Sequence, residues 1–199
     1  VTLNQADLKF YPKNPRVYSV LYSMDSEPSQ DEIEELMCEM EHVKELKLSI
    51  KSNGGLIDPL IVRAGELTVL EGNSRLAAHR ILSKEDPCKW AMVKCKLLPA
   101  DISEDAIFAL LGQYHIIGRK DWEPFEQASY LYRRKTETKL PVESMADELG
   151  ISKQKANQMI KVIEFMTENE DLNQRNWSEY EESLKNAPLK AYGESNPDR

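Results

Sequence analysis

Long hydrophobic runs are missing from this 199-residue sequence. Lys, Asp and Glu interrupt every apolar stretch, so none approaches the roughly 18–20 residues that a membrane span requires. The first residues also lack the basic and then apolar layout of a signal peptide. Cysteine is scarce: Cys38, Cys88 and Cys95 are too few, and odd in number, for a disulfide framework. We therefore expect a cytoplasmic protein without a membrane partner.

The sequence also lacks a zinc-type ligand pattern. Cys88 and Cys95 are separated by a spacing that suits zinc poorly, and His79 and His115 add no second ligand pair. We predict no metal-ligating residues from these side chains.

Positive charge is outweighed by negative charge, since 34 Asp and Glu stand against 26 Lys and Arg, for a net charge of −8. This balance excludes a uniformly basic coat for nucleic acid. Residues 25–47 and 164–199 are acidic, with nine acidic side chains each against two and four basic ones. Residues 133–161 reverse the sign, with seven Lys or Arg against four Asp or Glu. A DNA-facing surface is therefore expected in residues 133–161.

The hydrophobic pattern divides the chain into an α/β part and a helical part. Short apolar runs at 59–62 and 67–70, joined by a glycine-bearing connector, predict a β-hairpin. Further strands are expected near 8–10 and at 91–97, and helices at about 31–40, 42–52, 74–82 and 103–111. After residue 121 only helices are expected, at about 123–136, 142–149, 153–166 and 177–185. The predicted domains are 1–121 and 122–189, followed by a flexible tail at 190–199.

Local signals mark several boundaries of these elements. Ser29 followed by Glu32 fits a capping box, and Asn53-Gly54-Gly55 is a strong helix C-terminal signal. Pro12 and Pro15 predict a turn after the first strand.

A glycine turn stands between the hairpin and the next helix. In Leu70-Glu71-Gly72-Asn73-Ser74-Arg75, a strand ends at Gly72 and a helix opens with a hydroxyl and a guanidinium in its first turn. The first turn of a helix presents unpaired backbone N–H groups and a partial positive charge, which favour a phosphate. An ordinary strand–turn–helix junction with a surface Arg accounts for the same residues, so both interpretations stay open.

Residues 141–165 have the spacing of a helix-turn-helix. Ala146 is small where two helices would touch, Gly150 follows at the turn, and Ser152 can cap the second helix. The second helix is expected to expose a mixture of lysine and amide side chains, which suits contacts with bases and phosphates in a major groove. The candidate DNA-binding residues are Ser152, Lys153, Gln154, Lys155, Asn157, Gln158 and Lys161. A helical hairpin with a solvated basic face, or one that contacts a protein, is the alternative.

These segments resemble the ParB/sulfiredoxin superfamily. The run Gly55-Leu-Ile-Asp58-Pro59-Leu-Ile-Val62, and then Gly72-Asn73-Ser74-Arg75, is similar to the Gly-x-x-x-Pro-Leu-x-Val strand and the Gly-Glu-Arg-Arg turn of ParB proteins. Asn14-Pro15-Arg16 resembles the first segment of the family. Residues 119–128 resemble the Arg-x-Asp-Leu-x-Pro-x-Glu-x-Ala stretch that leaves the ParB nucleotide domain. The matches follow the order of the family over about residues 8–165.

The resemblance implies an α+β fold, in which a small mixed-sheet domain precedes an all-helical helix-turn-helix domain. It also implies a homodimer and a site for CTP or another nucleoside triphosphate, with Mg²⁺ as a candidate ion bound to the phosphates. The implied nucleotide-binding residues are Gly55, Asp58, Pro59, Glu71, Gly72, Asn73, Ser74, Arg75, His115 and Arg119.

Several departures from the family pattern bear on chemistry. Sulfiredoxins carry a catalytic Cys where this chain has Asn73, so their reductase chemistry is not expected. The Glu-Asn pair of ParB aligns with His115 and Ile116, and an imidazole can donate to a phosphate but cannot replace a carboxylate ligand of Mg²⁺. Ser74 replaces the first Arg of the turn, which removes one phosphate clamp. Glu71 is the single candidate catalytic residue, although we expect it to be an exposed strand-end side chain.

The expected function is that of a ParB-like DNA-binding, nucleotide-associated protein in DNA partition or in mobile-element or phage DNA handling. One alternative is an enzyme of the same superfamily, a nuclease or a nucleotide-dependent kinase with Glu71 as base. The other is a non-enzymatic helix-turn-helix transcriptional regulator. The sequence shows no two-metal carboxylate cluster for phosphodiester hydrolysis, and it leaves open whether the protein is an enzyme.

Overall fold

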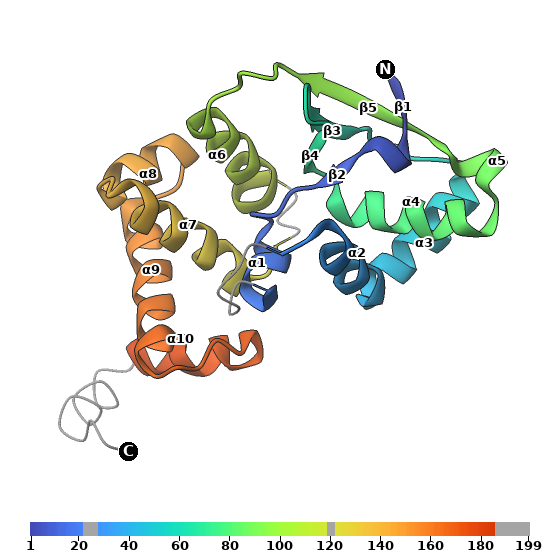
Figure 1. Cartoon of the computed structure of the whole chain (residues 1–199). Helices are drawn as coiled ribbons and strands as arrows, with labels where there is room; N and C mark the ends of the chain where they lie inside the picture. Colours follow the sequence, from blue (N-terminus) through green and yellow to red (C-terminus); the bar gives the residue numbers. More distant parts are fainter. Residues whose placement is uncertain (22–27, 119–121, 186–199) are drawn as a thin grey trace. The chain divides into compact units, whose positions relative to one another are not determined.

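The computed structural model describes residues 1–21, 28–118 and 122–185 (Figure 1). The chain forms two compact units, Val1–Leu111 and Gly112–Arg199. The first is α/β and the second helical, as the sequence predicts. The boundary between the two units falls earlier in the chain than the expected boundary between residues 121 and 122. Residues 113–118 belong to the second unit because they contact one of its helices. The tail expected at 190–199 lies outside the described residues.

The first unit contains a mixed five-stranded sheet with the strand order β1-β5-β3-β4-β2. Its strands are β1 (Thr2–Asn4), β2 (Lys9–Phe10), β3 (Leu60–Arg63), β4 (Thr68–Glu71) and β5 (Met92–Leu98). The antiparallel pairing of β3 with β4 confirms the predicted hairpin, while β3 runs parallel to β5 and β2 parallel to β4. The sequence does not predict β1, since so short a strand is defined only by its antiparallel pairing with β5.

The predicted helices of the first unit begin and end close to the expected positions, and two short helices that the sequence does not predict are added. In chain order the helices are α1 (Pro15–Leu21), α2 (Gln30–Glu39), α3 (Glu41–Asn53), α4 (Asn73–Glu85), α5 (Pro87–Trp90) and α6 (Glu104–Gly112), and the two additions are α1 and α5. The capping box of Ser29 and Glu32 is confirmed at the start of α2, and Gly54 ends α3 with φ +70°. The sequence predicts a turn at Pro15, but α1 begins there. Proline suits the first position of a helix, because its fixed φ is already helical and its missing N–H would have no partner.

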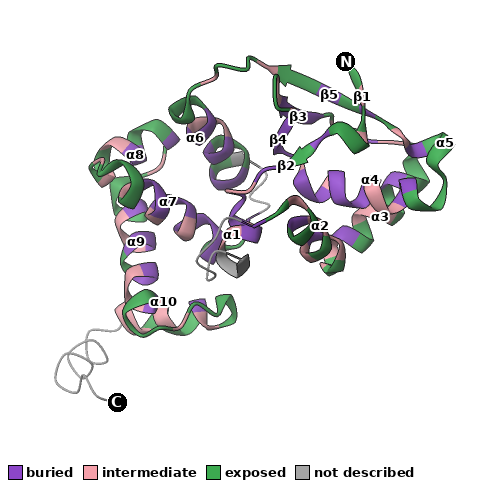
Figure 2. Cartoon of the chain, viewed as in Figure 1, coloured by how far each residue is buried: buried purple, intermediate pink, exposed green. Residues whose placement is uncertain are grey.

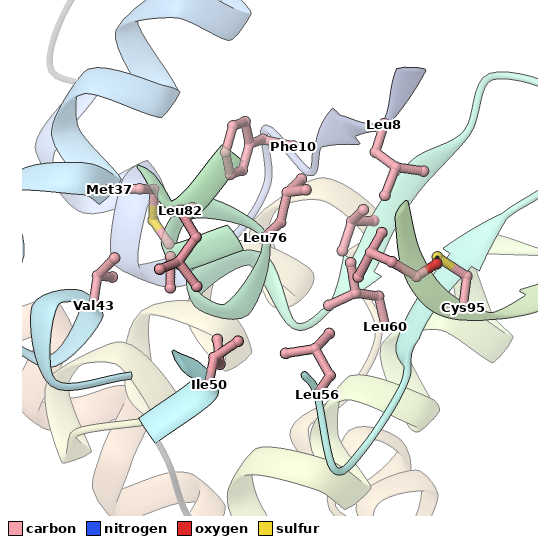
Figure 3. Packing of buried hydrophobic residues seen from close by; sticks show 14 of the residues in the cluster. Leu8, Phe10, Met37, Val43, Ile50, Leu56, Leu60, Leu76, Leu82 and Cys95 are labelled. Atoms are coloured by element: carbon pink, nitrogen blue, oxygen red, sulfur yellow. The ribbon is translucent and has the colours of Figure 1, made fainter. Parts of the chain in front are cut away.

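One hydrophobic core joins the sheet to α2, α3 and α4 (Figure 3). Leu60 of β3, Leu76 and Leu82 of α4 and Met37 of α2 are fully buried in it. Figure 2 shows α4 as largely buried, and this helix contacts α2, α3, β3 and β4. Since its side chains are enclosed on several sides, α4 is the element that positions the glycine turn at its first residue.

The second unit packs three helices around α9. Its elements are the π-helical segment η2 (Gln113–Gly118), α7 (Pro124–Thr138), α8 (Val142–Leu149), α9 (Lys153–Glu168), the 3-10 turn η3 (Gln174–Asn176) and α10 (Trp177–Lys185). All four predicted helices are present, and α9 contacts α7, α8 and α10. Within the described residues, none of the helices combines the length and the apolar character needed to cross a membrane.

A buried histidine makes the stability of the first unit depend on pH. His79 of α4 is 2% exposed, and its ring stands edge-on to the Trp90 indole with centroids 5.6 Å apart. Burial lowers the pKa of His79, because the charged ring loses its hydration, and a backbone hydrogen bond with Trp90 opposes this only in part. The folded ring therefore resists protonation at pH values where the unfolded ring, with a pKa of about 6.5, accepts a proton.

We expect the free energy of unfolding to fall between pH 7.5 and 5.5, and to fall less for His79→Gln. The unfolded state binds more protons in this range, so stability must rise with pH. Chemical denaturation at pH 7.5, 6.5 and 5.5 measures the difference between the two proteins. Titration of carboxylates changes the stability of the wild type and of His79→Gln equally, so it cancels in the difference between the two proteins. Parallel pH profiles for the two proteins would contradict the buried, neutral ring.

Candidate functional site

The glycine turn has the geometry that the sequence predicts. Gly72 directly follows β4, has φ +97° and is the N-cap of α4, where it provides no side-chain hydrogen bond to the first turn. The first turn of α4 contains no acidic residue. Backbone N–H groups at such a helix start carry partial positive charge and suit an anion. A Cβ on Gly72 would lie 2.7 Å from Leu60 Cδ2, so the close packing also requires glycine.

Asn73 serves as a structural link between strands. Its side chain is buried, accepts a hydrogen bond from the backbone N–H of Tyr11 at 2.9 Å and donates to the carbonyl of Val69 at 2.9 Å. These bonds join the segment after β2 to β4. Both ends of the Asn73 amide are used inside the fold, and a contact of Asn73 with nucleotide stays a prediction.

Ser74 lies between two basic side chains that come from other helices. Arg16 Nη1 of α1 donates to Ser74 Oγ at 3.3 Å, and His42 Nε2 of α3 lies 3.0 Å from the same oxygen. Burial, and then the neighbouring charge of Arg16, lower the pKa of His42, so that the ring is neutral near pH 7. Three elements thus bring an arginine, a histidine and a hydroxyl to the first turn of α4.

Arg16 and His42 are absent from the predicted site residues. Arg16 stands in the Asn14-Pro15-Arg16 segment, whose resemblance to the family is the one sequence signal that could have identified it. His42 has no comparable signal, because it comes to the turn only through the packing of α3 against α4.

Arg75 and Glu71 form a pair that the sequence does not predict. Arg75 Nη2 makes an ion pair with the carboxylate of Glu71, whose side chain is only 7% exposed. Arg75 Nη1 donates to the carbonyls of Asp58 at 2.7 Å and Pro59 at 3.3 Å. The exposed strand-end Glu71 expected above is therefore wrong, since the carboxylate is buried next to a guanidinium. Arg75 is likewise engaged within the fold.

The loop before β3 meets the turn through these carbonyls. Asp58 is half-buried and Pro59 exposed, and Gly55 lies at the start of the loop after α3. Because Arg75 bonds to the backbone of Asp58 and Pro59, it fastens this loop to the first turn of α4. Asp58 and Pro59 thus contact the turn, and their binding of nucleotide stays a prediction.

The other two residues predicted to bind nucleotide, His115 and Arg119, belong to another part of the chain. His115 lies in the second unit, where its ring stacks on Trp122 at a centroid distance of 4.1 Å and an angle of 10°. His115 is 6% exposed. Arg119 lies outside the described residues. A phosphate contact by either side chain stays a prediction.

The amino-terminal end of α9 presents exposed basic and amide side chains. Ser152 caps the helix by accepting from the N–H of Lys155 at 3.1 Å, and a left-handed Gly150 precedes it with φ +67°. Lys153, Gln154 and Lys155 are exposed, as is Lys161 nearly two turns further along the helix. The helix start and its exposed lysines therefore match the sequence prediction.

Two amides that we expect to read bases are instead bonded within the protein. Asn157 donates to the carbonyl of Lys153 at 2.9 Å, and Gln158 donates to Glu181 Oε1 of α10 at 3.0 Å. Of the three predicted base-reading amides, only Gln154 is fully exposed.

No protein-family model and no curated protein matches the sequence. Among solved structures, the chain is similar to the C-terminally truncated chromosome-partitioning protein ParB from Caulobacter crescentus complexed to the centromeric parS site, with 14% identity and a TM-score of 0.48. That alignment covers 98% of this chain and 90% of the other. The same truncated ParB complexed with CTP-gamma-S gives 14% identity and a TM-score of 0.38, with coverage of 98% and 97%.

Proposed function

We propose that the chain is a ParB-like protein that binds DNA through α9 and a nucleoside triphosphate at the first turn of α4. The observation that carries the proposal is the exposed group Lys153, Gln154 and Lys155 at the start of a helix that follows a glycine turn. A helix presented in this way can enter a major groove with its amino-terminal residues at the bases. Lys153, Lys155 and Lys161 would neutralise phosphates, and Gln154 would contact a base edge.

The nucleotide part of the proposal rests on the donors around Ser74. The N–H groups in the first turn of α4 have no side-chain cap, and Arg16 and His42 approach Ser74 from two other helices. These groups fit a phosphate, which accepts hydrogen bonds from backbone N–H groups and guanidinium. CTP or another triphosphate is the proposed ligand. Mg²⁺ is expected to matter little, because the carboxylate of Glu71, just before the turn, already pairs with Arg75.

The proposal includes a homodimer, a cytoplasmic location and a role in DNA partition or in mobile-element or phage DNA handling. A second candidate function is that of a transcriptional regulator in which α9 binds DNA and the α/β unit binds no nucleotide. The internal bonds of Asn73 and Arg75 favour it, because they occupy two side chains that would otherwise hold phosphates. An enzyme with Glu71 as base is disfavoured by the ion pair of that carboxylate.

A salt series tests the DNA-binding part. With duplexes selected on the wild-type protein, affinity measured by fluorescence anisotropy is expected to fall steeply as salt rises. Lys155→Ala should reduce the log–log slope by about one unit, the change for one lost phosphate contact. Gln154→Ala should relax the sequence preference at one position and leave the slope unchanged.

Lys94→Ala is the matched control, because Lys94 is exposed on β5 and its loss changes the net charge equally. If it lowers the slope as much as Lys155→Ala, α9 is not the DNA-binding helix. Absence of binding to any duplex at low salt contradicts both DNA-binding functions. Calorimetric titration with each triphosphate, with and without Mg²⁺, distinguishes the ParB-like function from the transcriptional regulator, because the regulator is expected to bind no triphosphate.

A further inference from the structure

The helix α10, the last element in the described part of the chain, carries three glutamates, Glu179, Glu181 and Glu182, against one lysine, Lys185. Aromatic contacts hold it on the helical unit. Phe165 of α9 and Tyr180 of α10 lie edge to face with ring centroids 5.3 Å apart, and Phe125 of α7 and Trp177 do so at 6.3 Å. Trp177 is buried. An acidic helix is therefore fixed beside the helix that we propose to bind DNA (Figure 1).

The contacts of α10 fall on the same stripe of α9 as the proposed base-reading residue Gln154. Gln154, Gln158, Lys161 and Phe165 follow one another at intervals of four, three and four, the spacing that places side chains on one face of a helix. Gln158 bonds to Glu181, and Phe165 packs on Tyr180. The helix α10 thus occupies the middle and the far end of a stripe that begins at Gln154.

The negative charges of α10 disfavour the approach of DNA to this stripe of α9. Glu181 holds the amide of Gln158, the kind of group that pairs with adenine in a major groove. The glutamates of α10 would also repel phosphates that approach the same stripe near Lys161, and this repulsion extends over the Debye length, about 8 Å at physiological salt. Lys185 lies 3.0 Å from Glu181 and offsets one of the three negative charges.

We propose that α10 is an acidic cover that competes with DNA for α9. It does so by holding Gln158 through Glu181 and by repelling phosphates from the stripe that Gln154, Gln158 and Lys161 share. This inference rests on the proposed DNA binding by α9 and names a regulation of that same site. Full engagement of DNA then requires the Gln158–Glu181 bond to break and the acidic face of α10 to move from the stripe.

The test replaces Glu179, Glu181 and Glu182 together by Gln, which removes the charges and keeps the side-chain shape. The matched control is the triple variant Glu35→Gln, Glu39→Gln and Glu45→Gln, at exposed positions of α2 and α3, which changes the net charge equally. Anisotropy with the selected duplex at low salt is expected to show about tenfold tighter binding for the α10 variant than for the control. Amide hydrogen exchange of residues 177–185 is expected to speed up when wild-type protein binds DNA.

Equal affinities of the two triple variants, with wild-type protein that does bind DNA, would overturn the acidic cover and leave the proposed function standing. Unchanged exchange of residues 177–185 on DNA binding would overturn it as well. If neither the wild type nor the variants bind any duplex, the proposed DNA binding fails, and the cover fails with it. Circular dichroism and melting curves verify that both variants fold.

Discussion

Arg75→Ala is expected to lower the free energy of unfolding by about 3 kcal/mol, because it leaves the buried carboxylate of Glu71 without its guanidinium. The Glu71 side chain is 7% exposed, so water cannot take over the lost interaction at little cost. The same change removes the two bonds that fasten the loop at Asp58 and Pro59 to α4. Urea denaturation followed by circular dichroism measures the loss.

The double variant Glu71→Gln with Arg75→Ala is the control for this result. It removes the carboxylate charge together with the guanidinium, so it is expected to be more stable than Arg75→Ala alone. If the double variant is instead as unstable as the single one, the loop bonds to Asp58 and Pro59 account for the loss and the buried charge does not. A stability equal to that of the wild type for Arg75→Ala would contradict the pairing altogether.

Gly72→Ala is expected to cost about 3 kcal/mol of stability and to abolish nucleotide binding at the turn. A residue with a Cβ at φ +97° is strained by about 1–2 kcal/mol. The added Cβ would also lie 2.7 Å from Leu60 Cδ2 and 3.0 Å from Arg75 Nη2, which forces core side chains to move. Denaturation measures the stability, and calorimetric titration with the triphosphate that the wild type binds measures the second effect.

Gly54→Ala separates the two costs. Gly54 has φ +70°, yet a Cβ there would meet no atom within 4 Å, so only the backbone strain remains. We expect a loss of about 1 kcal/mol for Gly54→Ala. Equal losses at both glycines would show that the packing around Leu60 and Arg75 adjusts without cost, contrary to the prediction for Gly72.

Much of the fold could be predicted from the sequence, because it depends on local signals. The capping box of Ser29 and Glu32 and the C-terminal Gly54 lie within a few residues of the helix ends that they define. The hairpin of β3 and β4 is joined by a short connector, and the start of α9 depends on Gly150 and Ser152 just before it. In each case the residues that decide the conformation are neighbours in the chain.

The site depends on contacts between residues that are far apart in the sequence, and these only the tertiary structure decides. Ser74 meets Arg16 and His42, which are 58 and 32 positions away, because α1 and α3 bring them to α4. Gln158 meets Glu181 23 positions along, because aromatic rings hold α10 on α9. Composition and periodicity place each side chain on its own helix, and packing of the cores then sets which side chain it meets. That is why the sequence alone identified the turn and the helix, and the structure alone identified their partners.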